Sequence, residues 1–304
     1  MSGGRHVPEV PARSAQTDSR TWDELVDRHV SATWAVPRAL GLRPDTAGAV
    51  AHTAWLRLAD QDAVEPGAFL LATARAEAVR AASWHAVEAV VAPPDPVLSA
   101  LDALPSRSRT LLRVLAAEPA PSEPELAAVL DVPVTVVGGA VAAALRRLAE
   151  GTGADETSSA LETLEALRRA VARHDPPPRA LVTAARAAHS WSSLEVELAP
   201  LADVPAAGDL VGVRDGAPDH ALRFTDGDRT VDVDVEAAGA ERSLTGALTP
   251  AVAAVVRVVA PAGAVEVRTD DLGRFVVDGL RAGPVRLVVT ADGAPVLRTE
   301  WVAL

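Results

Sequence analysis

The chain has 304 residues, a net charge of −12 and no cysteine. Its length allows two or three compact units, each with its own core. The absence of cysteine excludes disulfides, zinc ribbons and thiol nucleophiles, and it is typical of a reducing cytoplasm. All 29 basic residues are Arg, and residues 1–150 carry 14 of them against 18 acidic residues. This balance lacks the basic excess that drives non-specific DNA binding, so it argues against a protein that binds DNA by itself.

The first part of the sequence predicts a polar tail and then a helical domain. Residues 1–20 lack the apolar core of a signal peptide, and we expect a disordered tail there. The capping-box pair Thr21 and Glu24, followed by apolar residues at helical spacing, predicts a helix that ends near Gly41. Two more helices are expected over about 45–59 and 66–83. Residues 21–84 therefore predict one helical domain.

A second helical domain is expected after a proline-rich linker at residues 85–97. Its predicted helices cover about 98–117, 122–130 and 133–149, and Ser122 with Glu125 forms another capping box. The short helix, the tight turn and the last helix predict a helix-turn-helix within residues 98–150. Residues 151–207 then predict a linker and a helical connector, with helices over about 159–174 and 179–196.

From residue 208 the apolar pattern changes to a period of two, which predicts an antiparallel β-sandwich over residues 208–304. The residues expected to face its core include Val231, Val233, Val235, Phe275, Val277 and Trp301. The predicted fold class is thus multidomain: an all-α half with a helix-turn-helix, a helical connector and an all-β antiparallel sandwich. No stretch is long and apolar enough to span a bilayer, so we expect a cytoplasmic protein without membrane contact.

The sequence carries no motif of a known catalytic site. It has no Gly-x-Ser-x-Gly elbow, no His-Glu-x-x-His helix, no phosphate-binding Gly-Lys-Ser/Thr loop and no dinucleotide fingerprint. Acidic residues at Asp226, Asp228, Asp232 and Asp234 allow two interpretations, a calcium site or the solvated face of a strand. The alternation with valine favours the strand. We therefore expect no enzyme activity, no metal and no cofactor.

Three segments resemble region 2 of the extracytoplasmic-function sigma factors: Asp23-Glu-Leu-Val-Asp-Arg-His29, Val50-Ala-His-Thr-Ala-Trp-Leu-Arg-Leu58 and Pro66-Gly-Ala-Phe-Leu-Leu-Ala-Thr-Ala-Arg75. Segments of residues 98–149 resemble region 4 of the same family: Leu101-Asp-Ala-Leu-Pro105, Leu111-Leu-Arg-Val-Leu115, and Glu125-Leu-Ala-Ala-Val-Leu130 leading into Ala144-Leu-Arg-Arg-Leu148. Residues 269–280 and 283–289 resemble carboxypeptidase-regulatory-like sandwich modules, which are generally structural or binding units.

The sigma-factor resemblance implies core RNA polymerase and promoter DNA as partners. It implies DNA contacts from these residues: Trp55, Arg57, Arg75, Arg80, Thr135, Arg146 and Arg147. It implies polymerase contacts from Asp45, His52 and Thr53. Two of these roles have an alternative, because Trp55 could fill the core and the Arg146–Arg147 pair could be solvated charges at a helix end.

Departures from the family leave three functional interpretations open. Ala47, Gly48 and His52 stand where the family usually has an acidic pair and a Gln. After its first turn the predicted recognition helix carries Gly138 and Gly139, which offer no side chain to base edges. The chain could be an active sigma-like regulator, or an adaptor that has lost promoter recognition and acts through protein contacts. It could also be a sigma-like protein sequestered by its own sandwich, which would then have an intramolecular or protein partner.

Overall fold

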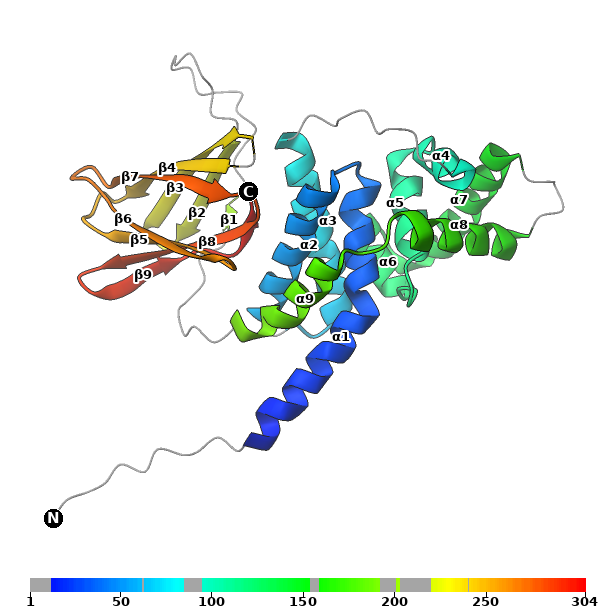
Figure 1. Ribbon diagram of the computed structural model, residues 1–304, viewed down its shortest axis with the longest axis horizontal. Helices are drawn as coiled ribbons and strands as arrows, with labels where there is room; N and C mark the ends of the chain where they lie inside the picture. Colours follow the sequence, from blue (N-terminus) through cyan, green and yellow to red (C-terminus); the bar gives the residue numbers. More distant parts are fainter. Residues whose placement is uncertain are drawn as a thin grey trace.

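A computed structural model describes residues 12–61, 63–84, 95–153, 159–191, 201–202, 220–239 and 241–304. A helical half precedes a half built of antiparallel strands (Figure 1). The described α-helices are α1 (Ala12–Ala39), α2 (Pro44–Ala59), α3 (Pro66–Trp84), α4 (Pro96–Asp102), α5 (Ser106–Leu115), α6 (Glu123–Leu130), α7 (Val137–Thr152), α8 (Ala160–His174) and α9 (Arg179–Ala188). Short 3-10 turns, η1 (Val134–Val136) and η2 (His189–Trp191), precede α7 and follow α9.

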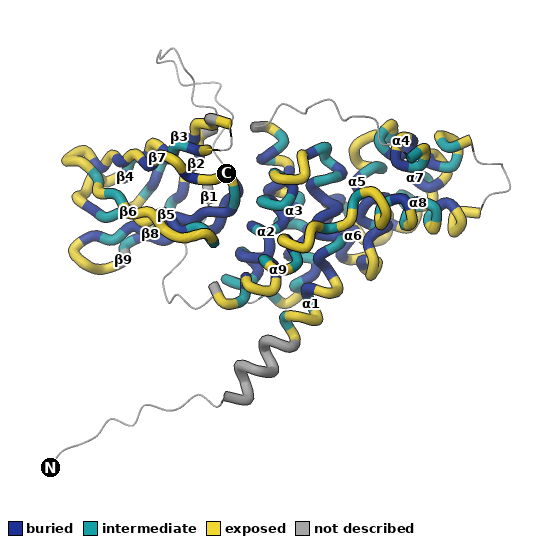
Figure 2. Tube along the Cα trace, in the orientation of Figure 1, coloured by how far each residue is buried: buried dark blue, intermediate teal, exposed yellow. Residues whose placement is uncertain are grey.

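The helices form one continuous core rather than two separate ones. α1 packs on α2, α3 and α5, and α3 packs on α6, so the two predicted helical domains share buried side chains. The connector helices α8 and α9 fold back, α8 onto α4 and α7 and α9 onto α1 and α2. Buried residues accordingly run through the middle of the helical half (Figure 2).

Three predicted helices have other boundaries in the structure, and one of them, expected over about 179–196, ends as α9 at Ala188 and continues as the 3-10 turn η2. α1 begins at Ala12 rather than near Thr21, because residues 12–20 contain Ala, Arg and Gln but no Pro or Gly and so extend the helix. Thr21 therefore lies inside α1 and does not cap it. The predicted helix over 98–117 is divided into α4 and α5 by Pro105, which is the N-cap residue of α5. The capping box of Ser122 and Glu125 is confirmed.

The C-terminal half consists of two antiparallel sheets with apolar side chains between them. One sheet has the order β1-β2-β3-β4-β7 and the other β10-β8-β5-β6, with β9 also paired to β8. The strands are β1 (Leu201–Ala202), β2 (His220–Asp226), β3 (Arg229–Ala238), β4 (Glu241–Thr249), β5 (Val255–Ala260), β6 (Gly263–Arg268), β7 (Arg274–Arg281), β8 (Pro284–Ala291), β9 (Ala294–Arg298) and β10 (Val302–Ala303).

Alternation along the strands places the sandwich core largely as predicted. Val231, Val233 and Val235 are buried, as are Phe275 and Val277. Trp301 is the exception. It is fully buried, but it belongs to the core of the helical half rather than to the core between the sheets. The sandwich therefore contributes an aromatic side chain to its neighbouring domain.

Helices α6 and α7 are joined through η1 and meet at a sharp angle. The axes of Glu123–Leu130 and Val134–Thr152 are bent by 98°. Among the described residues, this bent pair has the length and composition of a membrane span, whereas each helix taken alone does not.

Contact between α3 and α6 depends on a glycine. The Nε2 atom of His29 on α1 lies 3.5 Å from the Glu125 Oε1 atom on α6, and both side chains cover Gly67 in the first turn of α3. A Cβ atom at Gly67 would overlap the Glu125 carboxylate and lie 2.7 Å from His29 Cε1. Burial lowers the pKa of His29, although Glu125 opposes this change. The imidazole is therefore held mainly in its neutral form.

We expect Gly67→Ala to lower the free energy of unfolding by about 1–3 kcal/mol, because the added methyl must push α6 away from α3. Gly48→Ala is the matched control. Gly48 also lies in a helix, but a Cβ there meets nothing within 4 Å, and the substitution should stabilise the helix by about 0.4–1 kcal/mol. Urea unfolding monitored by circular dichroism measures both changes. Equal effects at the two positions would contradict close packing at Gly67.

Candidate functional site between the helices and the sandwich

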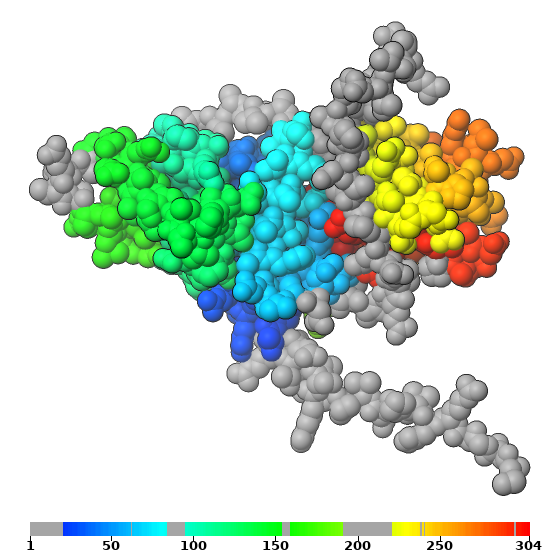
Figure 3. All heavy atoms as spheres, turned by 180° about the vertical axis from the view of Figure 1, so that it is seen from behind, coloured from blue at the N-terminus to red at the C-terminus, as the bar shows by residue number. Residues whose placement is uncertain are grey.

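The sandwich docks on the faces of α2 and α3. Strands β8 and β10 contact α2, and β10 also contacts α3. Val259, Trp301 and Ala303 of the sandwich pack into the helical core. Seen from behind, residues near the C-terminus lie against the helices coloured cyan (Figure 3). Charged side chains surround this apolar contact in two groups.

The first group, the Asp60 cluster, consists of Asp60, Arg286 and Arg298. The Asp60 Oδ2 atom lies 3.0 Å from Arg286 Nη1, and Oδ1 lies 3.0 Å from Arg298 Nη2. The three side chains are only 0–3% exposed. The Arg286 guanidinium also lies 4.4 Å from the centre of the Trp301 ring. Burial lowers the pKa of Arg286 to about 10, with Asp60 raising it and Arg298 lowering it, and at neutral pH the group stays charged.

The second group, the Arg57 cluster, consists of Arg57, Glu77, Arg80 and Glu300. Arg57 Nη2 lies 2.7 Å from Glu77 Oε1, and Arg57 Nη1 lies 3.0 Å from Glu300 Oε2. Arg57 Nε also donates a hydrogen bond of 2.6 Å to the Trp301 carbonyl. Arg80 pairs with Glu77 one turn earlier on α3. Burial, and then the neighbouring Arg57, lower the pKa of Arg80 to about 9, while Glu300 raises it. This cluster thus joins two helices to the sandwich.

Buried ion pairs of this kind specify a docking geometry more than they add stability. Removing charges from water is expensive, and their mutual attraction returns this free energy only when every group finds its partner. The two clusters therefore determine where the sandwich sits, while burial of the apolar side chains supplies the favourable free energy.

The structure separates the predicted DNA-contacting residues into two distant sets. Arg57 and Arg80 lie in the Arg57 cluster at the sandwich, and Arg75 is half-buried on α3. Thr135, Arg146 and Arg147 are exposed around α7, at the opposite end of the helical half (Figure 1). A single surface does not contain both sets in this arrangement.

Trp55 fills the core, which is the second of the two roles considered for it. It is fully buried, and its ring meets that of Trp22 edge to face, with centroids 5.7 Å apart and planes inclined by 73°. A buried ring offers no face to a nucleotide base, so the DNA contact predicted for Trp55 conflicts with this structure. Trp22 in turn stacks on His189 after α9, with centroids 5.2 Å apart. These rings tie the connector to α1 and α2.

The predicted polymerase-contacting residues differ in their accessibility. Asp45 is exposed near the start of α2, 3.6 Å from Arg43. Thr53 is fully buried and its hydroxyl donates to the Ala49 carbonyl at 2.9 Å, so it cannot reach a partner in this structure. His52 is half-buried, and burial lowers its pKa to about 4.

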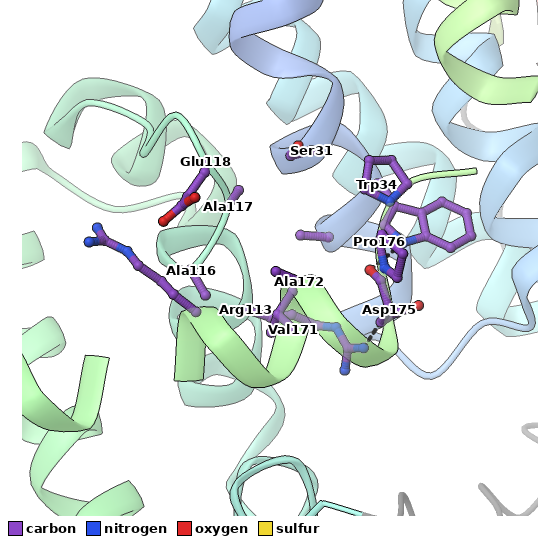
Figure 4. Close-up of a pocket in the computed structure, with 13 residues that line it drawn as sticks. Ser31, Trp34, Arg113, Ala116, Ala117, Glu118, Val171, Ala172, Asp175 and Pro176 are labelled. Atoms are coloured by element: carbon purple, nitrogen blue, oxygen red, sulfur yellow. Dashed lines mark hydrogen bonds and ion pairs between the residues drawn. The ribbon is translucent and has the colours of Figure 1, made fainter. Parts of the chain in front are cut away.

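A further, largely buried acid lies where α8 turns into α9. Asp175 accepts hydrogen bonds from Arg38 Nε on α1, at 3.1 Å, and from Arg113 on α5. Its backbone carbonyl accepts from Trp34 Nε1 at 3.1 Å. A cleft of about 140 Å³ lies beside it, lined by Trp34, Pro176 and small apolar side chains and also by the charged Arg113, Glu118 and Arg168 (Figure 4). Asp175 thus links the connector to both predicted helical domains.

Sequence reasoning missed the acids and arginines that join distant segments: Asp60, Glu77, Asp175, Arg286, Arg298 and Glu300. Asp60 stands just after a helix and Asp175 just before three prolines, and such positions are usually solvated. Among the described acids of the sandwich, Asp232 pairs with Arg223 at 2.5 Å, and no group of three or more His, Asp or Glu there could hold a metal.

No family model, curated protein or solved structure matches this chain.

We expect Asp60→Asn to lower the free energy of unfolding by about 3–5 kcal/mol, because two buried guanidinium groups lose the carboxylate that both contact. Asp45→Asn is the matched control, since the Asp45 side chain is 71% exposed and its change should stay within about 0.5 kcal/mol. Urea unfolding followed by tryptophan fluorescence measures both. Similar small effects would contradict a buried Asp60 cluster.

We expect His52 to make stability depend on pH. Its pKa is about 4 in the folded chain against 6.5 unfolded, so protons bind the unfolded chain first as the pH falls. The His52 contribution is complete above pH 6.5 and should decrease by about 3 kcal/mol on acidification to pH 4. His52→Gln should flatten this part of the profile in urea titrations between pH 7 and pH 4. Parallel profiles of the two proteins would contradict the burial of His52.

Proposed function

We propose that this chain is a sigma-factor-like regulator of transcription initiation that binds core RNA polymerase. The observation that carries the proposal is the ordered agreement between sequence and structure over the first half. The segments that resemble region 2 lie in α1, α2 and α3, and those that resemble region 4 lie in α4 to α7.

The geometry of α6 and α7 supports a helix-turn-helix in the second module. The two helices meet at 98° through a short turn, which is within the range of that motif. Val137, Ala144, Leu145 and Leu148 bury the inner face of α7, and its outer face carries exposed Arg146 and Arg147, with Thr135 exposed in the preceding turn η1. In this proposal the two arginines contact DNA phosphates, and polymerase supplies most of the remaining affinity for the promoter.

An adaptor that acts through protein contacts alone is the second candidate. It is favoured by the composition of the exposed surface around the start of α7. Val134 and Val136 are 42% and 47% exposed, and Gly138 and Gly139 are exposed beside them. Base-specific readout needs hydrogen-bond donors and acceptors at these positions, and this surface has few.

Binding to polymerase and promoter-dependent transcription distinguish the two candidates. Immobilised full-length chain should retain bacterial core RNA polymerase, and the eluted complex should produce promoter-dependent transcripts. Arg146→Glu with Arg147→Glu should lower transcription roughly tenfold, because phosphate contacts are lost, while polymerase retention stays unchanged. Arg169→Glu with Arg173→Glu, at exposed positions of α8, is the control with the same change in charge. Retention without transcripts would favour the adaptor, and failure to retain polymerase would overturn the sigma-like proposal.

A further inference from the structure

The face of α2 and α3 under the sandwich has a mixed charge pattern. Asp60 and Glu77 are 3% and 2% exposed, and Glu77 pairs with both Arg57 and Arg80 of the same face. The sandwich places a group of complementary charge or hydrogen-bonding character against each of these charged side chains. Two arginines of the Asp60 cluster approach Asp60, Glu300 approaches Arg57, and the Ala303 amide lies 3.5 Å from Glu77 Oε2. Trp301 fills the apolar centre between these contacts.

This pattern selects the chemistry of any other occupant. A nucleic acid backbone would bring phosphates next to two carboxylates, and like charges at such short range repel. It would also leave the carboxylate of Asp60 without a cation. A protein surface can offer arginine, carboxylate and an aromatic side chain together, as the sandwich does. Although Arg57 and Arg80 are basic, their surroundings therefore favour a protein partner.

We propose that the α2–α3 face is a protein-docking surface for which the sandwich and an external protein compete. The partner that fits presents arginine to Asp60, a carboxylate to Arg57 and an apolar wedge in the place of Trp301. This inference rests on the proposed function only in naming core RNA polymerase as that protein. The sandwich then acts as an intramolecular cover, and polymerase binding requires its release.

The character of the interface makes release feasible. Charged groups that separate regain their hydration. An interface rich in ion pairs therefore costs less free energy to open than a purely apolar interface of the same size. Contacts between domains of one chain are commonly of this reversible kind. The apolar part of the contact is limited to a few side chains, chiefly Val259, Trp301 and Ala303.

Charge reversal at Glu300 tests this competition in the full-length chain. Glu300→Arg places a cation beside Arg57 and leaves the helical face intact. The Glu300 side chain is 24% exposed, so the sandwich itself should fold. Glu266→Arg is the matched control, because Glu266 lies on an exposed strand and pairs at 3.7 Å with Arg257.

Two spin labels report the position of the sandwich relative to the helices. Since the chain has no cysteine, Ala76→Cys on α3 and Asp271→Cys between β6 and β7 introduce its only thiols. Both positions are exposed, so labels there should leave the interface unaltered. Double electron–electron resonance then measures the separation of the two labels.

Three probes are compared on both reversal variants and on the chain without a reversal: core RNA polymerase, a DNA duplex and a fluorescent peptide with the sequence of residues 296–304. In the Glu300→Arg chain the label distance should lengthen and polymerase affinity should rise roughly 5- to 150-fold, the range usual for coupled sites. The peptide should bind this chain and not the chain without a reversal. DNA should bind the two reversal variants equally.

Each contrary result has a distinct meaning. An unchanged label distance, or equal polymerase affinity before and after opening, overturns the inference and leaves the proposed function standing. A gain in DNA affinity beyond that of the Glu266→Arg control also overturns it, in favour of a nucleic acid face. If polymerase binds no variant but the peptide binds the opened chain, the proposed function fails and the inference holds. If neither polymerase nor the peptide binds the opened chain, the proposed function and the inference both fail.

Discussion

The Asp60 carboxylate is the constraint on which the arrangement of the two halves depends. It follows the last turn of α2 and is shared by two arginines of the sandwich, from β8 and β9, with all three side chains almost fully removed from water. A buried acid in this position needs both cations, and each cation needs the acid. This three-residue contact and the Arg57 cluster together therefore fix the relative position of helices and sheets, with Trp301 packed beneath Arg286.

A second carboxylate shared by two arginines lies inside the helical half. Asp175 is shared by Arg38 and Arg113, and thereby connects the end of α8 to α1 and α5. In both places one acid bridges two guanidinium groups from elements distant in the sequence. Arginine suits this role because its planar fork donates several hydrogen bonds at once and stays charged when buried. Two such bridges hold the first module, the second module, the connector and the sandwich in one closed arrangement.

The sequence predicts local structure well and long-range contacts poorly. Helical spacing located α2 and α3, the capping box of Ser122 located α6, and alternation of valines located β3, because each of these signals lies within a few residues. Trp55 is buried, as one of the two interpretations of this residue predicts. The buried acids gave no such signal, since the partners of Asp60 lie 226 and 238 residues away. The prediction that Trp301 lies in the sandwich core is wrong for the same reason, because its neighbours come from another domain.

Hydrogen–deuterium exchange on the full-length chain, alone and with core RNA polymerase, tests most directly whether the sandwich covers a docking face. If polymerase displaces the sandwich, amides of β10 and of the Trp301 segment should exchange faster in the complex, while amides at the end of α2 become more protected. Slower or unchanged exchange in β10 with polymerase bound would contradict the account, because the sandwich would then have stayed in place.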